Sequence, residues 1–238
     1  ISASCNTGLE ISKNKYFFIV DHDDLLPCFT TLILSAILLG NDFDFIYSDE
    51  DKVDERGIVY GPFYKPDWSP EYILSMMYTC HLSVYKTKIA KEINGFRSYF
   101  DGAQDYDFLL RYLSYAKKIK HIPFILYHWR AWSNSTAESI ENKPHALEKA
   151  KMALENYLVS RNEKFSLNYH NLKGHFIVDF YPKKNSLVSI VIPTANGKYK
   201  KNKKVLYHLD EVLRSIKENT KYIKYEIIVI HNNNLLPS

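Results

Sequence analysis

Three carboxylates stand within four residues, directly after a short apolar run. The run covers residues 16–20, and Asp21, Asp23 and Asp24 follow it. Neighbouring carboxylates repel one another, and burying them at the end of a strand is costly unless a cation shares the site. A divalent metal that carries phosphate is the simplest occupant. The alternative is a solvated acidic turn in which Asp24 caps the next helix.

A second acidic cluster follows the next predicted strand, which covers residues 43–47. The cluster contains Asp49, Glu50 and Asp51. In an open α/β sheet, ligands bind at the carboxyl ends of the strands. Two consecutive strands that each end in carboxylates therefore predict a ligand site at one edge of the sheet. A solvated hairpin loop over residues 49–55 is an equally good interpretation of the second cluster.

A further carboxylate, Asp105, lies in the first turn of a predicted helix. The apolar spacing of Phe108, Leu109 and Tyr112 indicates that helix. A helix dipole favours negative charge at this end, so charge complementation alone explains either Asp105 or Asp107. Catalysis by Asp105 is the other interpretation.

Aromatic and imidazole side chains supply more candidates. The segment over residues 60–70 is rich in proline and aromatic residues, which predicts an ordered loop. In such a loop Trp68 could offer a flat face to a sugar ring or a base, and packing within the loop is the alternative. His128 follows a predicted strand and could ligate a metal, although a lone histidine is more often a packed edge residue.

These residues need a scaffold, and the apolar pattern predicts alternating strands and helices. The run at residues 16–20 is short, β-branched and aromatic, as in a parallel strand that is covered on both faces. Helices are predicted over residues 1–14, 29–39, 88–93 and 144–159, and further strands over residues 81–85, 118–123 and 124–127. This pattern is typical of the α/β fold class.

The composition changes near residue 171. A strand pair that ends at residue 180 leads into a linker, and a new strand over residues 187–194 begins a second strand–helix–strand pattern. The basic run at residues 198–204 precedes the helix predicted over residues 205–219. It predicts a loop that is either solvated or attracted to phosphate or anionic lipid.

Length and composition limit the class of protein. With 238 residues, 46% of them hydrophobic, the chain can bury a sizeable core, and its formal charge of +4 is too small to favour nucleic-acid binding. The three cysteines lack metal-ligand spacing, which predicts reduced thiols in a cytoplasmic setting. The longest apolar stretch, residues 29–39, is too short to span a bilayer. We expect a soluble cytoplasmic chain and leave open its peripheral docking at the inner face of a membrane.

Taken together, several motifs resemble those of the family 2 glycosyltransferases, which have the GT-A fold. The motifs are VDHDD at residues 20–24, YSDEDK at 47–52, KPDWS at 65–69, GAQDYD at 102–107 and YHWR at 127–130. Within this family, the chain most resembles the bacterial rhamnosyltransferase-like, polysaccharide-assembly branch. The resemblance implies a mixed, mostly parallel sheet flanked by helices. It also implies that residues 1–165 are the C-terminal portion of one such domain, 166–186 a strand pair and linker, and 187–238 the start of a second unit.

The resemblance implies roles for individual residues. Asp21 and Asp23 match the DXD motif, so Asp21 would lie toward the nucleotide ribose and Asp23 would bind the Mn²⁺ or Mg²⁺ that bridges the donor diphosphate. Asp105 would be the general base that deprotonates the acceptor hydroxyl, with inversion at the anomeric carbon. His128 would complete the metal site. The acceptor would contact Trp68, Gln104 and Trp129.

The implied activity is the transfer of a sugar from a nucleotide-sugar donor to a hydroxyl of a glycan or lipid-linked acceptor, in cell-surface polysaccharide synthesis. Two alternatives stay open. A noncatalytic glycan-binding or scaffold module would keep the same fold, and a nucleotidyltransferase would use similar carboxylates with a glycine-rich basic loop that is not found near the first strand. The family's upstream donor-binding strands have no counterpart here, and His231 stands where relatives carry an acid. We therefore expect the isolated chain to be incomplete and inactive alone.

Overall fold

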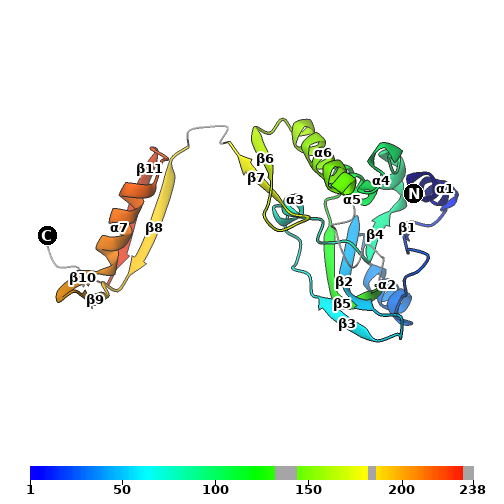
Figure 1. The fold of residues 1–238 in the computed structure, drawn as a ribbon, viewed down its shortest axis with the longest axis horizontal. Helices are drawn as coiled ribbons and strands as arrows, with labels where there is room; N and C mark the ends of the chain where they lie inside the picture. The colour runs from blue at the N-terminus through cyan, green and yellow to red at the C-terminus, as the bar shows by residue number, and fades with distance from the viewer. Residues whose placement is uncertain (132–143, 182–185, 233–238) are drawn as a thin grey trace. The chain divides into compact units, whose positions relative to one another are not determined.

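The computed structural model describes residues 1–131, 144–181 and 186–232 of the chain. The chain divides into two compact units, Ile1–Tyr181 and Pro182–Ser238 (Figure 1). All the residues predicted to act in a site belong to the first unit. The end of the predicted linker lies mostly outside the described residues, and the assignment of the units to two transferase domains stays a prediction.

A five-stranded sheet forms the centre of the first unit. It contains β1 (Tyr16–Phe18), β2 (Phe45–Val53), β3 (Val59–Phe63), β4 (Ser83–Lys86) and β5 (Ile119–Arg130). The first half of β2 pairs antiparallel with β4, its second half pairs antiparallel with β3, and β5 runs parallel to it. β1 joins the sheet through antiparallel pairing with β4. The predicted α/β class with a mixed sheet is confirmed.

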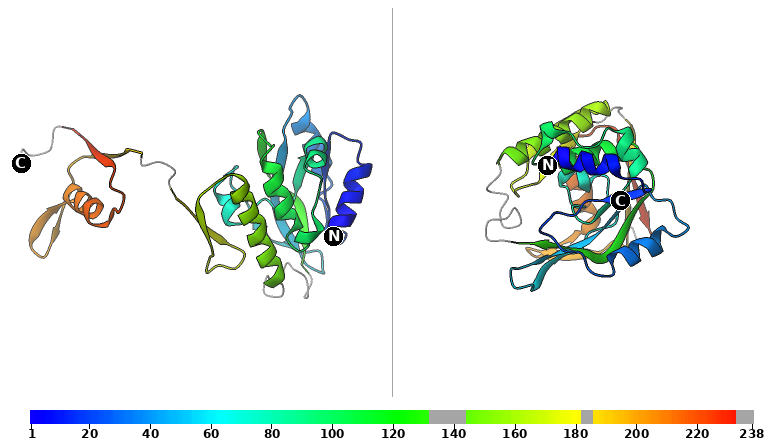
Figure 2. Two further views of the ribbon diagram at one scale, coloured as in Figure 1. Left: turned by 90° about the horizontal axis from the view of Figure 1, so that it is seen from above. Right: turned by 90° about the vertical axis from the view of Figure 1, so that its right-hand side faces the viewer.

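Helices cover both faces of this sheet (Figure 1, Figure 2). They are α1 (Ser2–Ile11), α2 (Thr30–Leu38), α3 (Tyr72–Ser75), α4 (Thr87–Glu92), α5 (Gln104–Leu113) and α6 (Pro144–Ser160), with a 3₁₀ turn at Ser98–Phe100. Successive side chains of β2 point to opposite faces. Phe45 belongs to the larger buried cluster, which includes Leu109 of α5, and Ile46 to the smaller one, which includes Leu34 of α2. The apolar face of α5 is therefore buried in the same cluster as the Phe45 face of β2, which holds this helix against the sheet.

Three strands differ from the predictions. β1 is shorter than the predicted run at residues 16–20, and its residues are half-buried. It pairs antiparallel with β4 and has no parallel neighbour among the described strands. β2 continues through the second acidic cluster to Val53. The two strands predicted over residues 118–123 and 124–127 are one strand, β5. Pro123 lies where the register with β2 shifts, which is a position that tolerates proline because no ladder hydrogen bond is required there.

The hairpin of β6 (Phe165–Tyr169) and β7 (Phe176–Phe180) belongs to the first unit, because β7 packs against α3 and Phe176 is buried in the larger cluster. The segment predicted as a loop over residues 60–70 also contains a strand, since β3 extends to Phe63. The three cysteines are free. Within the described ranges, no helix combines the length and the apolar character needed to cross a membrane.

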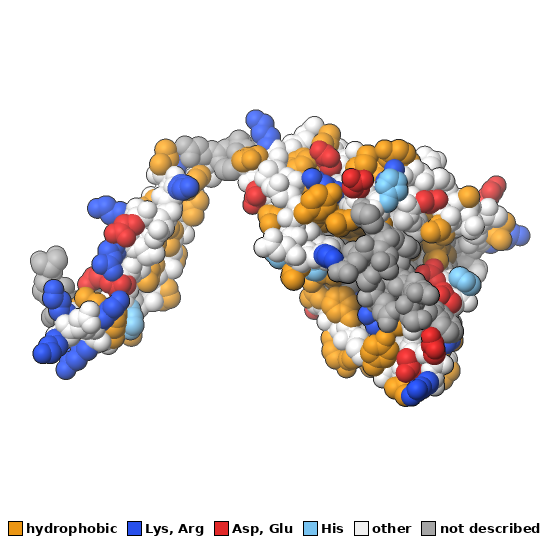
Figure 3. Space-filling model, in the orientation of Figure 1, with side chains coloured by type: hydrophobic (Ala, Val, Ile, Leu, Met, Phe, Trp, Pro, Cys, Tyr) orange, Lys and Arg blue, Asp and Glu red, His pale blue; other side chains and the backbone are white. Residues whose placement is uncertain are grey.

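The second unit contains β8 (Val188–Thr194), β9 (Lys198–Lys201), β10 (Lys204–Tyr207), α7 (His208–Asn219) and β11 (Tyr225–His231). β8 and β11 are parallel neighbours, as the strand–helix–strand pattern predicts. The basic segment at residues 198–204, predicted as a loop, is instead the β9–β10 hairpin. Asn202 and Lys203 have φ values of 50° and 66°, which the tight two-residue turn requires. Figure 3 shows Lys and Arg side chains gathered over this hairpin.

Candidate active site

One cavity of the first unit, of about 600 Å³, brings together five of the residues predicted to act in a site. Asp21 and Asp23 come from the segment after β1. Gln104 and Asp105 begin α5, and Trp129 lies near the end of β5. Segments that are far apart in the sequence therefore supply carboxylates and an indole to one opening.

The Asp105 carboxylate is open to water on the side of the cavity, but protein atoms enclose its other sides. This burial raises the pKa of Asp105 above its ordinary value, and the charge of Asp21 adds to the rise. The backbone N–H of Tyr106, which donates to Asp105 Oδ1 at 2.8 Å, and the nearby His81 oppose it. A carboxyl group with a raised pKa is a stronger base once it is ionised.

Asp107 stands in the same helical turn but has a different environment. Its side chain is 1% exposed and forms ion pairs with Arg97 and Arg111, the second at 3.0 Å. No described residue forms an ion pair with Asp105. The purely structural interpretation of an acid at the start of this helix therefore fits Asp107, whereas Asp105 remains available for chemistry.

The acids that follow β1 are held in different ways. Asp24 Oδ2 accepts a hydrogen bond from the Tyr127 hydroxyl at 2.5 Å, and its Oδ1 accepts one from the backbone N–H of Arg130 at 2.8 Å. Burial raises the pKa of Asp24, and these two hydrogen bonds oppose the rise. The backbone carbonyl of Asp23 accepts from Arg130 Nε at 2.6 Å. The interpretation of Asp24 as a helix cap is wrong, because α2 begins only at Thr30.

Asp21, Asp24 and His81 form a group that could hold a metal ion, since one ligand atom of each lies within 4.8 Å of the others. Carboxylates suit both Mg²⁺ and Mn²⁺, and an imidazole shifts the preference toward a transition metal. Two carboxylates and one imidazole are therefore a donor set that fits the expected divalent metal. Neither Asp23 nor His128 belongs to this group, and the ligand role predicted for them stays a prediction.

Sequence reasoning missed His81 as a site residue. The His81 ring stacks on the Tyr127 ring, with centroids 4.5 Å apart and planes at 14°. It also makes a T-shaped contact with the Trp129 ring, with centroids 5.9 Å apart. His81 also lines the cavity. The one signal in the sequence is an imidazole at the start of a predicted strand, which is too common to single it out.

The second acidic cluster lies inside the protein, where all three of its acids are buried in β2. Asp49 accepts from the backbone N–H of Lys65 at 2.9 Å and lies 2.8 Å from His121 Nε2. Asp51 lies 2.5 Å from His128 Nδ1. The interpretation of this cluster as a solvated loop is therefore wrong. It also follows that one ring nitrogen of His128 is engaged by Asp51.

Trp129 and Trp68, both predicted to contact the acceptor, lie in different places. Trp129 lines the cavity. Trp68 packs against the rings of Phe45, Tyr47 and Tyr78, at centroid distances of 6.4, 6.4 and 6.3 Å. Trp68 is not among the residues that line the cavity, so its contact with an acceptor stays a prediction.

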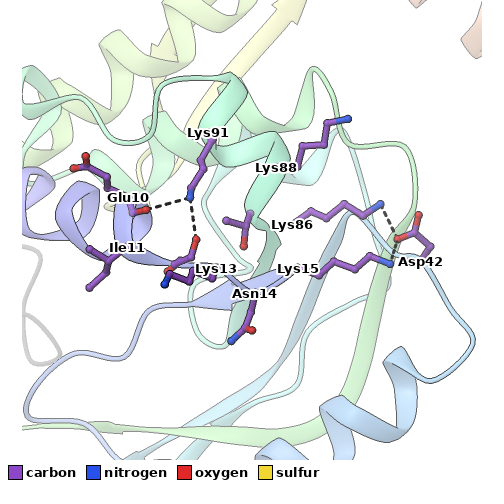
Figure 4. Close-up of a pocket in the computed structure, with 11 residues that line it drawn as sticks. Glu10, Ile11, Lys13, Asn14, Lys15, Asp42, Lys86, Lys88 and Lys91 are labelled. Carbon is purple, nitrogen blue, oxygen red and sulfur yellow. Dashed lines mark hydrogen bonds and ion pairs between the residues drawn. The ribbon is translucent and has the colours of Figure 1, made fainter.

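A second cavity, of about 1120 Å³, lies between the end of α1 with the residues that follow it, Asp42, and the segment from the end of β4 through α4, and five of its lining residues are lysines (Figure 4). Lys15 and Lys86 both pair with Asp42, at 2.8 and 2.9 Å. Lys91 donates to two backbone carbonyls at the end of α1 and just beyond it. None of the predicted site residues lines this cavity, and these three lysines already have partners within the protein. We assign it no part in the chemistry.

No family model matches the chain. Two curated proteins are similar to it. The uncharacterized protein y4gI of Sinorhizobium fredii is 34% identical over 247 residues, which cover 99% of this chain and 25% of that protein. The O-antigen biosynthesis protein RfbC of Myxococcus xanthus is 29% identical over 233 residues, which cover 98% of this chain and 18% of that protein. The chain thus spans a quarter or less of the length of these relatives.

Among solved structures, the chain is similar to S. aureus TarS 1-349 in complex with UDP-GlcNAc. The TM-score is 0.50 at 17% identity, and the match covers 65% of this chain and 44% of that chain. At this identity the likeness concerns the fold alone. The predicted GT-A-like arrangement, with a mixed sheet flanked by helices, is confirmed.

Proposed function

We propose that the chain is part of a metal-dependent glycosyltransferase that transfers a sugar from a nucleotide-sugar donor to a hydroxyl of a glycan or lipid-linked acceptor, in the synthesis of a cell-surface polysaccharide. The observation that carries the proposal is the shared cavity, in which Asp105 of α5 lies with Asp21 and Asp23 of the segment after β1. The similarity to a protein named for O-antigen biosynthesis supports the polysaccharide. The likeness to a fold solved with UDP-GlcNAc supports the donor class.

Asp105 acts in this proposal as the general base. Its ionised carboxylate removes the proton of the acceptor hydroxyl while that oxygen forms a bond to the anomeric carbon. The bond from the anomeric carbon to the donor phosphate breaks, and the nucleoside diphosphate leaves with the electron pair. Attack from the side opposite the leaving group inverts the anomeric centre, as the resemblance to family 2 implies. Burial that raises the pKa of Asp105 makes it a better proton acceptor than an ordinary aspartate.

Asp21, Asp24 and His81 are the residues that would hold the divalent ion, with Asp23 beside them on the cavity wall. A bound Mn²⁺ would supply positive charge for the departing diphosphate. The protein's own contribution is to hold the ligands. The Tyr127 hydroxyl donates to Asp24 and accepts from the backbone N–H of Asp21 at 3.2 Å, so one side chain of β5 contacts both of these acids in the segment after β1.

Trp129 and Gln104, which line the same cavity as Asp105, contact the acceptor in this proposal. The indole of Trp129 presents an apolar face with a polar edge, which matches a sugar ring. The side-chain oxygen of Gln104 accepts from the backbone N–H of Gly102 at 2.7 Å, which leaves its amide N–H₂ to donate to a hydroxyl. These contacts would place the acceptor hydroxyl beside Asp105.

A transfer assay tests the function. Radiolabelled nucleotide sugars with different bases and sugars are offered with Mn²⁺ and glycan or lipid-linked acceptors, to the protein as its gene encodes it, with any flanking sequence retained. We expect turnover with at least one donor, its loss in a metal chelator, and its recovery when Mn²⁺ is added back. The variant Glu92→Gln changes a surface acid on α4 that does not line the cavity, and it should keep full activity.

Glycan binding with no turnover for any donor would contradict the proposal and support a noncatalytic scaffold. Incorporation of a nucleotide with release of pyrophosphate would instead identify a nucleotidyltransferase. Turnover that is unaffected by chelation would remove the metal from the proposal and leave the transferase.

A further inference from the structure

A buried ion pair lies in the structure behind the cavity. The side chain of Lys65 is 0% exposed and that of Glu50 is 8% exposed, and Lys65 Nζ lies 3.0 Å from Glu50 Oε2. Charges removed from water need hydrogen bonds beyond their mutual attraction. The further hydrogen bonds of Lys65 and Glu50 therefore identify the groups that the pair holds in place.

Both members of the pair bind the same residue. The backbone N–H of His81 donates to Glu50 Oε2 at 2.9 Å, and Lys65 Nζ donates to the backbone carbonyl of His81. Lys65 Nζ also donates to the carbonyl of Thr79 at 2.8 Å. An ammonium has three N–H groups, and Glu50 and these two carbonyls use all of them. One ion pair thus fixes the backbone of His81 on both sides of its Cα atom.

The imidazole of His81 is held from another direction. It stacks on Tyr127, and the hydroxyl of Tyr127 donates to Asp24 and accepts from the backbone N–H of Asp21. Ligand atoms of the ring and of the two carboxylates lie within 4.8 Å of one another, and the backbone that carries the ring is the one that Glu50 and Lys65 bind. Neither Lys65 nor Glu50 is among the residues that line the cavity.

We propose that the Lys65–Glu50 ion pair is a positioning device that sets the place of the His81 imidazole beside Asp21 and Asp24. This role rests on the proposed function in one respect, which is that the His81 imidazole ligates the divalent ion. The pair itself touches neither the donor nor the acceptor. The second acidic cluster thereby acts on the site through the backbone of a neighbouring segment, although its own carboxylates are buried.

The test replaces the ion pair by the neutral, similarly shaped pair Lys65→Met with Glu50→Gln, in the whole chain. The first measurement is the NMR signal of the His81 ring protons, which stacking on Tyr127 shifts upfield. The second is the Kd for Mn²⁺ alone, by calorimetry, in the wild-type and in the His81→Ala background. The control is Lys86→Met with Asp44→Asn, which removes a different ion pair, between the last residue of β4 and the residue before β2, with charged atoms 2.8 Å apart.

We expect the substitution of the Lys65–Glu50 pair to move the His81 signals toward those of an unstacked ring, while the control leaves them unchanged. Loss of a group that orients a metal ligand weakens metal binding by about 10-fold or more. We expect that loss in the wild-type background. In the His81→Ala background the same substitution should change the Kd less than about twofold, because its effect passes through the imidazole.

An unchanged His81 signal would overturn the proposal, and so would an equal weakening of Mn²⁺ binding in both backgrounds. If the wild-type chain binds no Mn²⁺, the metal in the proposed function fails, and the NMR measurement still decides the positioning role. If the double variant does not fold, Glu50→Asp retains both charges but shortens the acid. The same shift of the His81 signals is then expected, and its absence counts against the proposal.

Discussion

Asp105 and Asp107 are two residues apart in one helical turn, and their surroundings differ. Asp107 is enclosed and paired with two arginines, whereas Asp105 borders the cavity with no such pair among the described residues. Asp107→Asn should lower the free energy of unfolding by about 2–3 kcal/mol, toward the lower end for a buried pair because Arg97 stays partly exposed. Asp105→Asn should not lower it, because burial disfavours the ionised carboxylate that the amide replaces. Urea denaturation of both variants measures the difference, and equal losses would contradict these assignments.

The raised pKa of Asp105 also predicts a pH dependence. The reaction needs the ionised carboxylate, so kcat/KM should rise with pH through a midpoint above the ordinary value of 3.8. For stability the sign is opposite: the folded state favours the protonated form, so this contribution is present at low pH and is lost as pH rises through the raised pKa. A pH–rate profile of the wild type and of Asp105→Asn checks the assignment. An acid limb that persists unchanged in the variant would exclude Asp105 as its source.

At the scale of elements, α5 must be anchored to place Asp105. Leu109 is 0% exposed and belongs to the larger buried cluster that includes Phe45 of β2. Leu109→Ala should therefore destabilise the first unit by about 2–5 kcal/mol through lost burial and the cavity it leaves. Leu39→Ala, at a side chain that is 82% exposed, is the control and should change stability by less than about 0.5 kcal/mol. Similar effects of the two changes on thermal unfolding would refute this anchoring.

Much of this architecture follows from local pattern, as for α2, α5 and α6, whose apolar periodicity matches the helices observed. β2 shows where such reasoning stops. A run of acids is typical of a loop, so the strand is predicted to end before Asp49, but partners from distant segments, His121 and His128, make the continued strand stable. Those pairings are non-local, and no window of sequence contains them. Pro123 likewise predicts a break between two strands, but the register shift that accommodates it within one strand depends on the pairing of β5 with β2.

At the scale of the whole molecule, one cavity draws on three distant regions of the first unit. The order of the motifs resembles that of the family, and this resemblance implies one site for seven residues. Five of them, Asp21, Asp23, Gln104, Asp105 and Trp129, line one cavity, whereas Trp68 and His128 do not line it. The same order does not predict His81, whose place depends on the buried pair of Lys65 and Glu50, or the packing of Trp68 into the core. The second unit has a strand–helix–strand pattern with parallel strands and a basic hairpin.

In the proposed reaction, the carboxylate at the start of α5 deprotonates the acceptor hydroxyl that attacks a donor held by the acids after β1. The most direct test is Asp105→Asn in the protein as its gene encodes it, with the donor Kd and the transfer rate measured on the same sample. We expect a donor Kd within about twofold of the wild type and a kcat lower by about 100-fold or more, which is the usual contribution of a general base. A variant that binds the donor and transfers the sugar at the wild-type rate would contradict it.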